Sequence, residues 1–116
     1  MQMSKYLFVD TKLSPSDVTW AWLSNHDYKI IRTFEEFKST IEKSGLPEFF
    51  CLDDVLGMDC AKWISEHCAK LDVDMPSNMV HTRKRVKGKK IANVLAFYVF
   101  NRNDKKHERS CSETNS

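Results

Sequence analysis

The chain has 116 residues, of which 41% are hydrophobic and 29% are charged, and its formal net charge is +2. This length fits one domain with a modest core, and this composition excludes a wholly disordered chain. No apolar run is long enough to span a bilayer, so we expect a cytoplasmic protein without membrane contact.

The first strand and helix are predicted within residues 6–22. An apolar run without alternation at residues 6–9 is typical of a strand buried on both faces, and Asp10 ends it. The Ser-Pro-Ser-Asp order of residues 14–17 is that of a helix start. Residues 18–22 would continue this helix with an apolar stripe.

Two further strand and helix units follow in the middle of the chain. Residues 28–31 predict a second strand, and Thr33 with Glu36 predicts the capping box of a helix that ends at Gly45. Residues 49–52 predict a third buried strand, and the next helix begins at Gly57 and carries apolar residues at helical spacing up to residue 71.

The last third of the chain predicts a weak strand and a helix. Residues 79–80 give the strand, and residues 91–99 have apolar side chains at i, i+3, i+4, i+7 and i+8. A strand over residues 94–100 is the alternative, because this segment is rich in β-branched and aromatic residues. We expect a domain over residues 1–103 and a polar, disordered tail over residues 104–116.

Strands that alternate with helices at this spacing predict βαβ units and a parallel sheet. Right-handed crossovers would place helices on both faces. The fold class expected is therefore α/β, a small three-layer sandwich with a mainly parallel sheet of four or five strands.

Cysteine positions agree with a cytoplasmic protein. Cys51, Cys60 and Cys68 fall on apolar patterns, Cys111 lies in a polar stretch, and no two of them form a CxxC pair. These features are typical of reduced, structural thiols.

Polar side chains follow three of the predicted strands. They are Asp10, then Asp53 with Asp54, then His81 with Thr82. Ligands of parallel sheets bind at the carboxyl ends of strands, and Asp10 and Asp53 converge there if the first and third strands are neighbours.

This convergence predicts either a metal site or an acid–base site. Asp10, Asp53 and Asp54 could hold Mg²⁺, which prefers oxygen ligands, or Asp10 and Asp53 could exchange a proton. His81 is suited to acid–base work at neutral pH. The alternatives are aspartates that cap the next helix and a histidine that is hydrogen-bonded at the sheet edge.

The charge is unevenly distributed. Residues 1–78 contain 8 Lys and Arg against 13 Asp and Glu, a net charge of −5, and residues 79–116 contain 10 against 3, a net charge of +7. Basic residues crowd the entry to the last helix, where the helix dipole opposes them unless an anion binds. With Thr82, they are the candidate phosphate or nucleic-acid contacts: Arg83, Lys84, Arg85, Lys87, Lys89 and Lys90. A solvated basic surface is the alternative.

Several segments resemble the cyclic-phosphate-processing receiver-like domains. Val-Asp at residues 9–10 and Ile-Arg-Thr at residues 31–33 are similar to the opening of that family. The segment Cys-Leu-Asp-Asp-Val-Leu-Gly at residues 51–57 resembles its SLDHDLG motif, and Val-His-Thr at residues 80–82 resembles its HSANPVGRENI-type segment. The resemblance covers roughly residues 6–98, in the family's order.

The resemblance implies a receiver-like, flavodoxin-like fold with an acidic pocket and a histidine. It implies processing of cyclic phosphate ends, in RNA repair or processing, with Asp10, Asp53 and His81 at the matching positions. Three motifs differ here. The acid pair after the first strand is Asp-Thr, and the Asp-His-Asp of the family is Asp-Asp-Val at residues 53–55. The Asn and Gly that follow the family's His-Ser pair are Lys84 and Lys87.

Two functions from different classes therefore remain. The first is a domain that acts on or binds phosphate-bearing RNA ends or nucleotides. The second is a non-catalytic binding, adaptor or inhibitor protein, of phage or bacterial type, which contacts a protein or nucleic acid through its basic C-terminal third.

Overall fold

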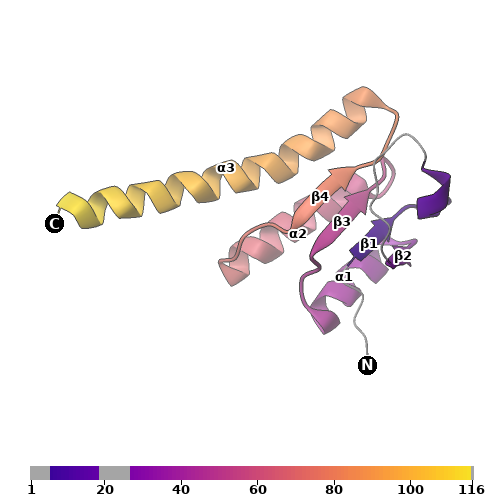
Figure 1. Ribbon diagram of the computed structural model, residues 1–116, viewed down its shortest axis with the longest axis horizontal. Coiled ribbons are helices and arrows are strands. Elements are labelled where there is room, and N and C mark those ends of the chain that lie inside the picture. Colours follow the sequence, from indigo (N-terminus) through magenta and orange to yellow (C-terminus); the bar gives the residue numbers. More distant parts are fainter. Residues whose placement is uncertain (1–5, 19–26, 116) are drawn as a thin grey trace.

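The computed structural model in Figure 1 describes residues 6–18 and 27–115, and the side chains of these residues up to 102. Its strands are β1 (Tyr6–Val9), β2 (Tyr28–Ile31), β3 (Phe49–Leu52) and β4 (Ser77–Val80). Its helices are the 3₁₀-helix η1 (Pro15–Asp17) and the α-helices α1 (Phe34–Ser44), α2 (Gly57–Leu71) and α3 (Arg85–Asn115).

The four strands form one parallel sheet in the order β2-β1-β3-β4. The α/β receiver-like fold class is thus confirmed, with four strands in the described residues. The first and third strands are neighbours, which is the condition for the convergence of Asp10 and Asp53. This order reverses between β1 and β3, which is where parallel sheets of this kind place their ligands.

One face of the sheet carries all three α-helices. Inward side chains of β1 and β3 pack there against α1, α2 and α3 in a core of thirteen buried residues. The opposite face carries a smaller cluster of Phe8, Cys51 and Val18, where Val18 directly follows η1. The rest of the helix predicted over residues 18–22, which would complete the third layer, lies outside the described residues.

The start and end of α1 follow the predicted signals. The Thr33 hydroxyl accepts a hydrogen bond of 3.1 Å from the amide of Glu36. The Glu36 carboxylate accepts from the amide of Arg32 at 2.9 Å, one residue earlier than a capping box requires. Gly45 ends the helix with a backbone φ of 86°, a value that residues with a side chain rarely adopt.

The segment 94–100 is helical, so the alternative of a strand there is wrong. Ile91 and Leu95 are buried in the core, because helical spacing brings them to the same face of α3. The Tyr98 hydroxyl donates to the carbonyl of Val73 at 2.6 Å, which joins α3 to the segment after α2.

Arg102 makes a second attachment of α3. Its guanidinium lies 2.7 Å from a carboxylate oxygen of Asp72 and 2.7 Å from one of Asp74. The backbone helix continues from there to Asn115, and the yellow end of α3 in Figure 1 extends away from the sheet. The division into a domain over residues 1–103 and a disordered tail stays a prediction.

None of the helices in residues 6–18 and 27–115 is both long enough and apolar enough to cross a membrane.

The packing of α3 can be tested by truncating one buried and one exposed side chain. Leu95→Ala should lower the free energy of unfolding by about 2–5 kcal/mol, because it removes core contacts and leaves a cavity. Phe97→Ala should change it by less than about 0.5 kcal/mol, since Phe97 is 68% exposed. Urea denaturation measures both, and equal effects of the two substitutions would contradict the packing of α3.

Candidate functional site at the carboxyl edge of the sheet

The register of the sheet brings the three predicted catalytic residues together. The last residues of β1, β3 and β4 are paired with one another, so the next residue of each strand lies in the same row. These next residues are Asp10, Asp53 and His81. Side chains alternate between faces, so all three lie on the face opposite the α-helices, and their exposed fractions are 6%, 3% and 2%.

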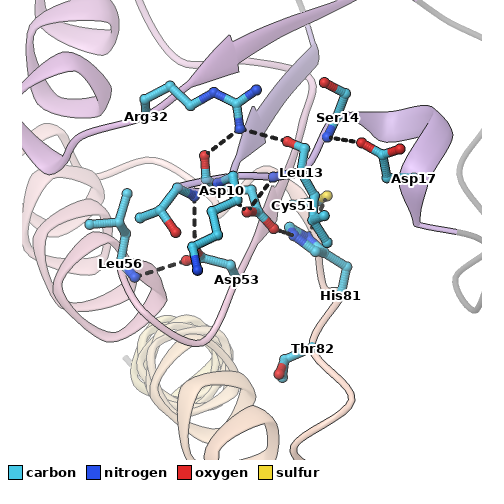
Figure 2. Close-up of polar contacts among 12 residues, drawn as sticks. Asp10, Leu13, Ser14, Asp17, Arg32, Cys51, Asp53, Leu56, His81 and Thr82 are labelled. Carbon is cyan, nitrogen blue, oxygen red and sulfur yellow. Dashed lines mark hydrogen bonds and ion pairs between the residues drawn. The ribbon is translucent and has the colours of Figure 1, made fainter.

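His81 is held from three sides in this row. Its Nε2 lies 2.9 Å from Oδ2 of Asp10, and its Nδ1 lies 3.0 Å from the sulfur of Cys51 (Figure 2). The imidazole also stacks on the ring of Phe8, with 4.6 Å between ring centroids and 15° between ring planes. The ring is therefore fixed in position, and both nitrogens contact groups of the chain.

Asp10 is an acceptor whose two oxygens have different partners. Oδ1 accepts hydrogen bonds of 2.8 Å from the amides of Lys12 and Leu13, and Oδ2 faces His81. Burial by itself raises the pKa of Asp10, but these amide hydrogen bonds and the contact with His81 together hold it below its usual value. Asp10 is thus a carboxylate at neutral pH.

The pKa of Asp53 is shifted in the opposite direction to that of Asp10. Oδ1 accepts from the amide of Leu56 at 2.8 Å, and Oδ2 accepts from the amide of Thr11 at 3.3 Å. Burial raises the pKa of Asp53 above its usual value, and the negative charge of Asp10 adds to this. Neighbouring carboxyl groups whose pKa values are pushed apart are typical of acid–base sites.

The three carboxylates proposed for Mg²⁺ do not form a ready metal site. Asp54 points to a different partner, since its Oδ2 lies 3.2 Å from the ammonium of Lys84. Each oxygen of Asp10 and Asp53 already faces a hydrogen-bond donor of the chain. Within the described residues, no three carboxylate, thiol or imidazole groups are arranged as metal ligands. A carboxylate oxygen that accepts one hydrogen bond keeps a second lone pair, so Mg²⁺ binding to Asp10 and Asp53 stays a prediction.

The basic residues lie at the rim of the row and along α3. Arg83 and Lys84 are exposed in the loop that directly follows His81 and Thr82, and the Thr82 hydroxyl accepts from the amide of Lys84 at 3.1 Å. The remaining candidates are exposed in the first two turns of α3: Arg85, Lys87, Lys89 and Lys90. Lys84 and Lys87 lower the pKa of Asp54, against the effect of its partial burial.

Two residues of the site were not predicted. Cys51 was assigned only to a buried strand, although it lies two residues before Asp53 and therefore faces the same side of the sheet. Arg32 ends up beside the loop after β1, where its Nη1 donates to the carbonyls of Asp10 at 3.0 Å and Leu13 at 2.7 Å. The alternation of strand side chains could have identified Cys51. Arg32 directly follows the second strand, so the rule that placed Asp10 at the carboxyl edge could have identified Arg32 as well.

A groove in the described residues lies elsewhere, between α2 and α3. Phe97, Tyr98 and Arg102 are among its lining residues, and none of the predicted site residues lines it. Arg102 and Tyr98 are engaged there in the attachment of α3, so this groove is not the candidate site.

Comparison with known proteins identifies the family of the chain. The sequence model of the family described as "Cyclic-phosphate processing Receiver domain" matches residues 5–97, a range that contains Asp10, Asp53 and His81. Searches of curated proteins and of solved structures found no match. Because the family match covers most of the chain, the chain belongs to the family of cyclic-phosphate processing receiver domains.

Proposed function

We propose that this domain binds a phosphate-bearing end of a nucleic acid, or a nucleotide, at the carboxyl edge of its sheet and opens a cyclic phosphate there. The observation that carries the proposal is the buried contact of 2.9 Å between His81 and Asp10, in one row with Asp53. An imidazole beside a carboxylate is a common arrangement for proton transfer, because the carboxylate stabilises the charged ring.

The proposed reaction needs one group that accepts a proton and one that donates a proton. Water attacks the phosphorus of a 2′,3′-cyclic phosphate, one P–O bond to the ribose breaks, and the leaving oxygen takes a proton. His81 takes the proton of the attacking water, with Asp10 stabilising the imidazolium. Asp53 is the second group, and its raised pKa favours its protonated, donating form.

Substrate binding must change the contacts of His81. Both ring nitrogens face groups of the chain in this structure, Nε2 towards Asp10 and Nδ1 towards Cys51. A phosphate therefore has to share or displace one of these contacts before the ring exchanges a proton with it. Arg83 and Lys84 follow the His81–Thr82 pair, which suits them to attract the phosphate to this edge.

The internal hydrogen bonds of the row also favour a second function, in which the domain binds without catalysis. Asp10 and His81 contact each other, and both Asp10 and Asp53 accept hydrogen bonds from nearby amides, so the row is stable without a ligand. In this case, the domain is a receiver-like binding, adaptor or inhibitor protein. Its main contact with a protein or nucleic acid would then be the basic residues between 83 and 90.

An end-group assay separates the two functions. The protein is incubated with an RNA oligonucleotide that ends in a 2′,3′-cyclic phosphate, with and without Mg²⁺, and the end group is read by mass spectrometry. Opening adds the mass of one water. His81→Ala and Asp53→Asn should each lower the rate by about 10²-fold or more, since general acid–base groups contribute factors of this size.

Matched variants control this assay. His67→Ala removes a histidine of α2 that stacks on Trp63, and Asp59→Asn removes an exposed carboxylate of α2, so both should keep full activity. An unchanged end group in every reaction would contradict the catalytic function and favour the non-catalytic binder.

The basic rim predicts salt-dependent binding of single-stranded RNA with a terminal phosphate. Arg83→Ala and Lys87→Ala should each reduce the slope of log K against log salt concentration by about 0.7, the effect of one lost phosphate contact. Fluorescence anisotropy at several salt concentrations measures the slope. Lys38→Ala, in an exposed position of α1, should leave it unchanged. Equal slopes for all variants would exclude Arg83 and Lys87 as phosphate contacts.

A further inference from the structure

We propose that Cys51 is a positioning residue of His81, and that its thiol donates a hydrogen bond to Nδ1 of the ring. In the neutral ring, the proton then lies on Nε2, at the side of Asp10. The inference deepens the proposed function, because it assigns which nitrogen of His81 carries the proton and which one can accept a proton. The inference concerns the ligand-free protein, so it can fail while the proposed function holds. It can also hold if the domain turns out not to open a cyclic phosphate.

The partners of Asp10 decide which nitrogen of His81 carries the proton. Its Oδ1 accepts two backbone amides at 2.8 Å, so the group behaves as a carboxylate that has only acceptor capacity left at Oδ2. The contact of 2.9 Å between Oδ2 and Nε2 of His81 therefore requires a proton on Nε2. A neutral imidazole with its proton on Nε2 has an acceptor at Nδ1.

Cys51 supplies the donor for that acceptor. Its sulfur lies 3.0 Å from Nδ1, and its side chain is fully buried beside the ring. Burial, followed by the charges of Asp10 and Asp53, raises the pKa of the Cys51 thiol to about 12. The sulfur thus keeps its proton at neutral pH and can donate it.

Three contacts together restrain the ring. Asp10 holds Nε2, Cys51 holds Nδ1, and Phe8 stacks on the ring plane. A thiol can also turn its hydrogen away and accept weakly from a charged imidazolium, so Cys51 accommodates the ring in both protonation states. A serine hydroxyl can do the same, and an alanine cannot.

Nuclear magnetic resonance of the His81 ring nitrogens tests the inference. Long-range ¹⁵N–¹H spectra are recorded at about pH 9, well above the ordinary pKa of imidazole, with His81→Gln used to assign the signals. The wild type should show a protonated Nε2 and an Nδ1 signal shifted by an accepted hydrogen bond. Cys51→Ala should move the Nδ1 signal towards that of a free acceptor, and Cys51→Ser should restore it.

Infrared spectroscopy tests the direction of the bond separately. The difference between the wild type and Cys51→Ser isolates the S–H stretching band of Cys51, which should lie at a lower frequency than that of a free thiol. His81→Phe should shift this band back, because it removes the acceptor and keeps an aromatic ring beside Phe8.

Cys60 is the matched control, since its thiol is equally buried but lies in the helical core on the other face of the sheet. Cys60→Ala should leave the His81 signals unchanged. Each of three results would overturn the inference. They are a proton on Nδ1 in the wild type, an unshifted S–H band for Cys51, and an Nδ1 signal that is the same in Cys51→Ala as in the wild type. The wild-type spectra decide the question even if the alanine variant does not fold.

Discussion

The candidate site depends on the parallel register of β1, β3 and β4. Because these strands end in the same row, the residue after each end points to the same side of the sheet. A slip of one residue in β4 would turn His81 towards the helical face and remove it from Asp10. The amide of His81 donates to the carbonyl of Leu52 at 2.9 Å, which continues this register one residue beyond β4.

Burial of this polar row is compatible with stability because its members are hydrogen-bonded. A buried carboxylate without partners would destabilise the fold, but Asp10 and Asp53 accept from backbone amides of the loops that follow β1 and β3. Arg32 supports the same arrangement from β2 by donating to two carbonyls of the loop after β1. The loops therefore form part of the site, and their amides lower the pKa of both carboxyl groups. The pKa of Asp53 is nevertheless raised, because burial and the charge of Asp10 outweigh its amide hydrogen bonds.

Much of this arrangement could be predicted from local patterns. Short apolar runs ended by Asp10 and Asp53 predicted buried strands, and the alternation of strands and helices predicted a parallel sheet. From the sequence alone, the neighbourhood of the first and third strands was only a condition. The helical spacing of Ile91 and Leu95 predicted α3 better than β propensity did, because their packing against the sheet and α2 decides the structure.

The rest of the site depends on contacts that no local pattern encodes. One is the hydrogen bond of Arg32 to the loop after β1, and the other is the ion pair of Asp54 with Lys84, which separates Asp54 from the other two carboxylates. Both depend on side-chain conformations in three dimensions.

The most direct test of the account is a double-mutant cycle on the free energy of unfolding with Asp10→Asn and His81→Gln. The account predicts a favourable coupling of about 0.5–3 kcal/mol between the two residues. Additive effects, equal to those of a control cycle with Asp59→Asn and His81→Gln, would contradict it.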